Sequence, residues 1–96
     1  MAGWILTSSD PDMTLRIAPG SIKAIGRSAQ AEFIVEAPLV SRLHCRLTVD
    51  ASDQLLAEDL ESTNGIQVNG AKVDRAMMKA GDILTVGRVN FDITRA

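Results

Sequence analysis

The stretch Leu43-His44-Cys45-Arg46-Leu47-Thr48-Val49 alternates between apolar and polar residues, and this pattern decides the fold class. A period of two is that of a β-strand, whose successive side chains point to opposite faces of a sheet. It puts Leu43, Cys45, Leu47 and Val49 on one face, which we expect to be buried. A strand with one apolar face is typical of an antiparallel sheet that packs against a second layer.

Short segments of the same kind extend in both directions from this stretch. We expect further strands at residues 4–7, 13–17, 21–25, 33–35, 55–60, 66–68, 83–86 and 89–93. Asn69-Gly70, between Val68 and Val73, predicts a two-residue hairpin, since both turn residues tolerate a positive φ. Only residues 74–80 have a helical composition, and that segment is too short to compete. The sequence therefore predicts an all-β fold, an antiparallel β-sandwich.

Length and composition are those of one ordinary globular domain. The 96 residues suit a single domain, residues 1–96, and the chain is 46% hydrophobic and 23% charged. No apolar run is long enough to span a membrane, and the first ten residues do not read as a signal peptide. We expect a cytoplasmic location and no contact with membranes.

The charge and the rarer residue types exclude several classes of function. The net charge is −2, and the only aromatic residues are Trp4, Phe33 and Phe91, which disfavours nucleic-acid binding. The single cysteine, Cys45, cannot form an internal disulfide, and the single histidine, His44, cannot build a multi-histidine metal site. We therefore expect no nucleic acid, no metal and no cofactor.

Three segments between the expected strands are rich in polar groups. They are Gly26-Arg27-Ser28, residues 40–44, and residues 59–65 with the following Val68-Asn69-Gly70. They supply two guanidinium groups, several hydroxyls, and side-chain amides next to glycines. These groups suit a phosphate monoester, because arginine presents a planar fork to the anion while hydroxyls and backbone N–H groups donate further hydrogen bonds.

The spacing of these segments resembles that of the forkhead-associated (FHA) domain. That family has Gly-Arg, then Ser-Arg-x-His about fourteen residues later, then Asp-Leu-x-Ser-x-Asn-Gly and Val-Asn-Gly. This chain has Gly26-Arg27, Ser41-Arg42-Leu43-His44, Asp59-Leu60-Glu61-Ser62-Thr63-Asn64-Gly65 and Val68-Asn69-Gly70. The resemblance covers about residues 4 to 93. It implies a sandwich of about eleven strands whose loops at one end bind a phosphothreonine peptide.

The resemblance also assigns roles to single residues. Arg27 would contact the phosphate, Ser41 would donate its hydroxyl to a phosphate oxygen, and Arg42 occupies a second phosphate-contacting position. Thr63 would add a hydroxyl and help form the pocket for the threonine methyl group. Asn64 would hold the ligand backbone through its side-chain amide.

Further positions take weaker or structural roles. Asn69 would contact the ligand backbone, and Leu39 would face the ligand side chain three positions after the phosphothreonine. Asp59 is expected to accept hydrogen bonds from loop amides, and His44 to support the binding loops. The motif positions expected to be structural are Gly26, His44, Asp59, Ser62, Gly65 and Gly70.

The chain departs from the family pattern at four positions, none of which is an expected phosphate ligand. Glu61 replaces the usual glycine after Asp-Leu and adds a negative charge near the phosphate position, and the sequence leaves open whether this weakens or abolishes phosphate binding. Ile66 replaces a threonine, Glu32 an aspartate and Gln67 an aromatic residue. Leu39 predicts an apolar preference for the ligand residue that it faces.

Two other classes of function stay open beside phosphothreonine recognition. Ser41, His44 and Asp59 are the residue types of a hydrolase triad, and Cys45 is a candidate nucleophile. No Gly-x-Ser-x-Gly motif is present and a small sandwich leaves little room for a substrate, so we expect no enzyme. The remaining alternative is a scaffold that binds unmodified proteins. The favoured partner is a phosphothreonine-containing protein or peptide, such as a Ser/Thr kinase or its substrate.

Overall fold

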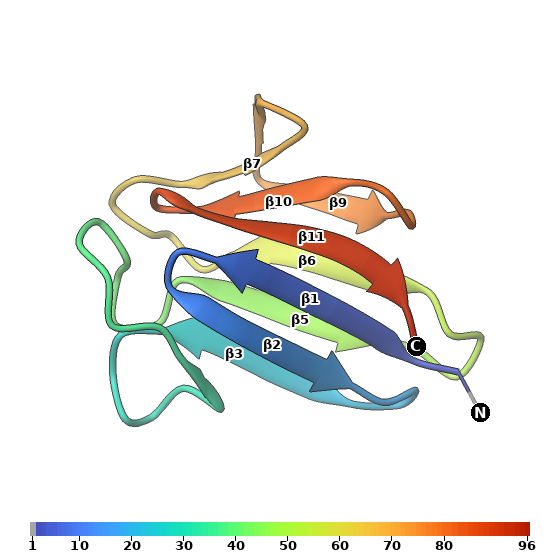
Figure 1. Ribbon diagram of the computed structural model, residues 1–96. Helices are drawn as coiled ribbons and strands as arrows, with labels where there is room; N and C mark the ends of the chain where they lie inside the picture. The colour runs from blue at the N-terminus through green and yellow to red at the C-terminus, as the bar shows by residue number, and fades with distance from the viewer. Residues whose placement is uncertain (1) are drawn as a thin grey trace.

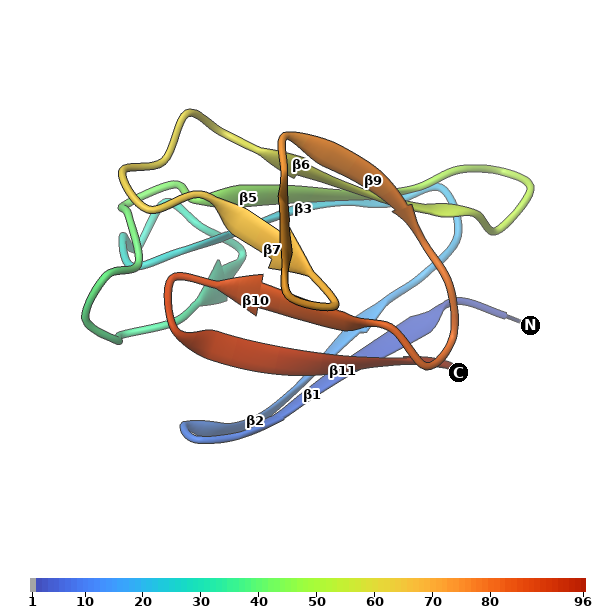
Figure 2. The ribbon, with the colours of Figure 1, turned by 90° about the horizontal axis from the view of Figure 1, so that it is seen from above.

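Two β-sheets pack face to face and enclose the core (Figures 1 and 2). The computed structural model describes residues 2–96, and this part of the chain is all-β, as the sequence predicts. One sheet has the order β2-β1-β11-β10-β7-β8 and the other β4-β3-β5-β6-β9. The strands are β1 (Trp4–Ser9), β2 (Asp12–Ile17), β3 (Ile22–Gly26), β4 (Phe33–Ile34), β5 (Cys45–Val49), β6 (Leu55–Asp59), β7 (Ile66–Val68), β8 (Ala71–Val73), β9 (Arg75–Met78), β10 (Ile83–Val86) and β11 (Val89–Arg95).

The period of two explains which side chains form the core. In β5, Cys45, Leu47 and Val49 are buried while Arg46 is exposed. The expectation that Leu43 shares their face is wrong, because β5 begins only at Cys45 and the Leu43 side chain is 39% exposed. His44, directly before β5, is buried instead, and its backbone bonds to the carbonyl of Ile25 (2.8 Å) and the amide of Leu60 (2.9 Å).

Two further strands complete the sheets, β9, which the sequence pattern did not indicate, and β8, which follows the predicted hairpin turn. Residues 75–78, whose composition favours a helix, form β9 and pair with β6 from Leu55↔Met78 to Glu58↔Arg75. Ala71–Val73 forms β8, which pairs with β7 across the predicted Asn69-Gly70 turn. Both turn residues have a positive φ, 52° for Asn69 and 85° for Gly70, as a two-residue hairpin requires. One strand pair, β3 with β4, is parallel, so the sandwich is not wholly antiparallel.

The chain ends meet at one end of the sandwich, and the polar loops lie at the other (Figure 1). The amide of Ala96 donates a hydrogen bond to the carbonyl of Gly3 (3.1 Å). Residues 27–32, 35–44 and 60–65 connect strands at the opposite end, on the left of Figure 1. None of the residues 2–96 belongs to a helix long and apolar enough to cross a membrane.

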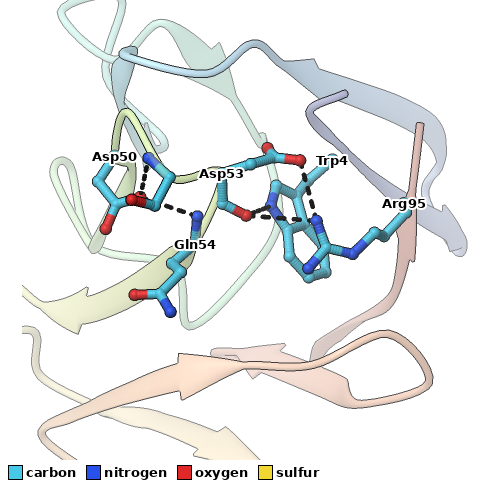
Figure 3. A network of polar contacts seen from close by, with 6 residues as sticks. Trp4, Asp50, Asp53, Gln54 and Arg95 are labelled. Carbon is cyan, nitrogen blue, oxygen red and sulfur yellow. Dashed lines mark hydrogen bonds and ion pairs between the residues drawn. The ribbon is translucent and has the colours of Figure 1, made fainter. Parts of the chain in front are cut away.

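A polar network closes the end that holds the termini (Figure 3). The indole N–H of Trp4 donates to the carbonyl oxygen of Asp53 (3.1 Å), and the Arg95 guanidinium binds the Asp53 carboxylate (2.9 Å). The same guanidinium lies 4.3 Å above the centre of the Trp4 ring, which adds a cation–π contact. The turn between β5 and β6 is thereby tied to β1 and β11, so the two sheets are joined at this end.

Candidate functional site

The loops after β3, before β5 and after β6 surround an open depression of about 830 Å³. Residues from all three polar segments that the sequence singles out line it. The lining residues are Arg27, Ser28, Gln30, Leu39, Val40, Ser41, Arg42, Leu43, Glu61, Thr63 and Asn64. Six of the seven predicted ligand contacts are among them, and the exception is Asn69.

Backbone contacts between β3 and the loop before β5 bring the two arginines to the same place. The amide of Arg27 donates to the carbonyl of Ser41 (3.0 Å), and the amide of Ser28 donates to the carbonyl of Arg42 (3.1 Å). Gly26 makes this approach possible, because a Cβ atom there would overlap the Arg42 carbonyl group. A glycine is therefore required directly before Arg27.

His44 joins the loop before β5 to the loop after β6. Its side chain is fully buried, and its Nδ1 accepts a hydrogen bond from the amide of Ser41 (3.0 Å). The proton of the neutral ring consequently sits on Nε2, which donates to the carbonyl of Gly65 (2.8 Å). Both ring nitrogens thus bond to backbone groups, one in each of the two loops.

Ser41 and Asn64 connect the same two loops at the surface of the depression. The Ser41 hydroxyl oxygen accepts a hydrogen bond from the amide of Thr63 (3.1 Å), which leaves its own proton free to be donated. The Asn64 side-chain amide donates to the carbonyl of Leu39 (3.0 Å). Leu39 has a positive φ of 71°, and its side chain is exposed.

Asp59 and Ser62 fold the loop after β6 internally. The Asp59 carboxylate accepts hydrogen bonds from the amide and the hydroxyl of Ser62. The Ser62 hydroxyl oxygen in turn accepts from the amide of Gly65 (2.8 Å), which has a positive φ of 75°. Thr63 and Asn64 therefore lie on a loop whose shape is set from within.

These contacts argue against a Ser-His-Asp relay. Ser41 bonds to the Thr63 amide, His44 to two backbone groups and Asp59 to Ser62, so the three side chains do not bond to one another. Burial raises the pKa of the Cys45 thiol to about 12, which keeps it in the unreactive protonated form. Within residues 2–96 no group of three or more His, Cys, Asp or Glu side chains is placed to hold a metal ion.

The charged side chains of the depression are free of internal partners. Arg27, Arg42 and Glu61 are all exposed. Among the described residues, ion pairs form only between Arg46 and Glu58 and between Arg95 and Asp53, outside the depression. The two guanidinium groups of the depression are thus available to an anion from outside.

Asn69 lies at the other end of β7, outside the lining of the depression. Its side-chain amide donates to the Asp82 carboxylate (3.0 Å), and its amide oxygen accepts from the backbone N–H of Ile83 (2.9 Å). Both ends of the amide therefore hold the turn before β10. At the neighbouring Gly70, nothing lies within 4 Å of the position that a Cβ atom would take.

The structure also shows features that no sequence motif indicated. Gln30 lines the depression, and its amide donates to the hydroxyl oxygen of Ser28, a residue of the polar segment Gly26-Arg27-Ser28 (3.1 Å). The closeness of Gln30 to Gly26-Arg27-Ser28 in the sequence is the only signal that could have found it. A second hollow of about 230 Å³ is formed by residues that are far apart in the sequence: Asp10, Pro11, Ala37, Pro38, Arg88 and Val89.

Comparison with known sequences identifies the family. The profile of the FHA domain matches residues 24–87. An ABC transporter ATP-binding/permease protein of Mycobacterium tuberculosis is 35% identical over 79 residues (82% of this chain), and the FHA domain-containing protein FhaA of the same organism is 39% identical over 74 residues (77% of this chain). The chain spans only 9% of the transporter and 14% of FhaA.

Solved structures agree with this match over nearly the whole chain. One structure, from an analysis of phosphothreonine-dependent FHA domain interactions, is 30% identical with a TM-score of 0.87, and the match covers 96% of this chain and 95% of that chain. The FHA domain of FhaA, complexed with the intracellular domain of another protein, is 29% identical with a TM-score of 0.83, and covers 97% and 99%. Profile, sequence relatives and fold together show that this chain belongs to the FHA domain family.

Proposed function

We propose that the depression binds the phosphothreonine of a partner protein and that the chain is a recognition module in Ser/Thr kinase signalling in the cytoplasm. The observation that carries this proposal is the meeting of Arg27, Arg42 and Ser41 in one depression, with both guanidinium groups free of internal acidic partners. The similarity to a structure studied for phosphothreonine-dependent interactions supports it.

The chemistry of the lining suits a phosphate monoester. Such a group carries about −1.5 to −2 charges at neutral pH, which two guanidinium groups balance. The Ser41 hydroxyl keeps a proton to donate, since it accepts from the Thr63 amide, and the Thr63 hydroxyl is the second neutral donor. Each charge-assisted hydrogen bond contributes about 1.5–3 kcal/mol, offset by desolvation and ordering of the peptide, so we expect micromolar affinity.

Recognition requires no chemical step by the protein. The Ser41, His44 and Asp59 side chains are held in separate contacts, and Cys45 is a buried thiol. In this proposal Arg27 and Arg42 hold the phosphate, Ser41 and Thr63 complete its hydrogen bonds, and Asn64 holds the ligand backbone. Leu39 then contacts an apolar ligand side chain three positions after the phosphothreonine.

The test is a titration of the protein with a degenerate phosphothreonine peptide library, beside the same library with phosphoserine and with unmodified threonine. We expect micromolar binding of the phosphothreonine peptides alone and a loss of at least tenfold in Arg27→Ala. Arg16→Ala is the matched control, because Arg16 is an exposed residue of β2 outside the depression. Equal binding to all three libraries would overturn the proposal in favour of a phosphate-independent scaffold.

A further inference from the structure

The two loops that form the depression run in opposite directions. At one end of their contact, the amide of Leu60 donates to the carbonyl of His44 (2.9 Å). At the other end, the side chain of Asn64 donates to the carbonyl of Leu39 (3.0 Å). From Leu60 to Asn64 the residue numbers rise, while those of their partners fall from His44 to Leu39, as in an antiparallel pair. Leu39 therefore marks one end of the depression and the Leu60–His44 contact marks the opposite end.

Glu61 directly follows Leu60, so it lies at the end of the depression opposite to Leu39. Arg42 and Leu43 directly precede His44, the residue bonded to Leu60, and both line the depression with Glu61. Glu61 is the only acidic residue in the lining, and its exposed side chain makes no hydrogen bond or ion pair with the described residues. Its φ of 54° is a left-handed conformation that is costly for a residue other than glycine, asparagine or aspartate.

The charges of an occupied site do not balance within the protein. Arg27 and Arg42 together carry two positive charges, which a phosphate of about −1.5 to −2 neutralises. The carboxylate of Glu61 then stays without a counter-charge at the Arg42 end of the depression. A ligand with a cationic side chain at this end supplies that counter-charge, whereas an acidic one is repelled.

We infer that Glu61 makes this site select phosphothreonine segments that carry lysine or arginine close to the phosphothreonine, on the side away from the residue that contacts Leu39. The inference rests on the proposed phosphothreonine recognition and adds the second chemical group of the ligand. In this role Glu61 is a specificity residue, and the phosphate is still held by Arg27, Arg42 and Ser41.

The experiment is a positional scan of one phosphothreonine peptide that binds the wild-type protein. Lysine, alanine or glutamate is placed in turn at each position from three before to three after the phosphothreonine, and dissociation constants are measured at low and high salt. Exposed ion pairs are weak, so we expect lysine to bind about two- to fivefold more tightly than alanine at positions on one side only. This preference should shrink at high salt, because mobile ions screen the pair.

Glu61→Gln keeps the shape of the side chain and removes its charge, so it should abolish the preference for lysine. Glu36→Gln is the matched control, because Glu36 is an exposed acid that does not line the depression, and it should keep the preference. Glu61→Gly relieves the left-handed backbone, so it should fold at least as stably as wild type and also lose the preference. Thermal unfolding of each variant checks that it is folded.

The outcomes separate this inference from the proposed function. Wild-type binding of phosphothreonine peptides without a preference for lysine overturns the inference and leaves the proposed function standing. A preference that survives in Glu61→Gln overturns it as well. If the wild-type protein binds no phosphothreonine peptide at all, the proposed function is wrong and the inference falls with it.

Discussion

At the scale of single residues, His44 connects two of the loops that surround the depression. It is buried, and its two ring nitrogens hold the Ser41 amide and the Gly65 carbonyl, which belong to different loops. The Ser41 hydroxyl and the Thr63 amide meet at the same junction (3.1 Å). Groups that line the depression are thus held in place by a buried side chain that does not itself line it.

His44→Ala should therefore reduce both stability and binding. Removing the ring leaves the partly buried Ser41 amide and the buried Gly65 carbonyl without their partners, and a buried unpaired group costs about 1–3 kcal/mol. We expect the free energy of unfolding, measured by urea denaturation, to fall by about 2–4 kcal/mol. Arg27→Ala is the contrasting variant, since it should lose binding while its stability changes by less than about 0.5 kcal/mol. A stability of His44→Ala close to that of wild type would contradict this role.

At the scale of strands and turns, sequence reasoning worked where the signal is local. The alternation in residues 45–49 and the Asn69-Gly70 turn each specify a strand or a hairpin from a few neighbouring residues. It did not find β9, because Met77 and Met78 favour a helix by composition, and pairing with β6 overrides that preference. The left-handed conformations of Leu39 and Glu61 were also not predictable from residue type.

The site shows the same division. The motif spacing indicated Arg27, Ser41, Arg42, Thr63 and Asn64, and all five line the depression. The hydrogen bonds that hold them in place join residues 22 to 25 positions apart in the sequence. Thr63 bonds to Ser41, and Asn64 bonds to Leu39. No sequence pattern encodes such contacts, so they became known only from the structure.

The turn before β10 should make the protein sensitive to acid. The hydrogen bond from the Asn69 side chain, and next that from the Lys79 amide, lower the pKa of Asp82 below its usual 3.8. The carboxylate therefore stabilises the folded state above about pH 4, and this contribution is lost as the pH falls through the lowered value. Asp82→Asn should melt at a lower temperature than wild type at pH 7, and the gap should narrow by pH 2.5. A gap that stays constant with pH would contradict this account.

In the polar network at the terminal end, Trp4 should contribute more to the free energy of unfolding than Arg95 (Figure 3). Trp4 is almost fully buried, so Trp4→Ala should lower the free energy of unfolding by about 3–5 kcal/mol. The Arg95 side chain is 54% exposed, so Arg95→Ala should cost less than about 1 kcal/mol. Urea denaturation measures both, and Arg95→Ala should bind ligand like wild type because it lies at the far end from the depression. A larger cost for Arg95→Ala would show that the ion pair, and not the burial of Trp4, holds this end.

At the scale of the whole molecule, the depression and the chain termini lie at opposite ends of the sandwich. The depression is built from loops at one end, while the termini and the Trp4–Asp53–Arg95 network lie at the other (Figures 1 and 3). The strands between them carry the buried core. Changes at the terminal end should therefore leave the geometry of the binding loops intact.

Attachment of the protein to a surface tests this separation. The protein immobilised through its amino terminus and the protein immobilised through its carboxyl terminus should bind the same phosphothreonine peptide with dissociation constants within about twofold of each other, because neither tether approaches the loops. Surface plasmon resonance gives both values, and titration in solution gives the reference. A tether at either end that blocks binding would mean that the termini influence the depression.

The hydrogen bond between Ala96 and Gly3 has a mechanical consequence for any longer chain that includes this domain. Segments joined to its two ends would start side by side, so the domain would stand beside the path of that longer chain. Tension along that path would pull on the joined ends and would not act on the loops around the depression. Such an arrangement would leave the depression exposed without altering the spacing of the other parts of a longer chain.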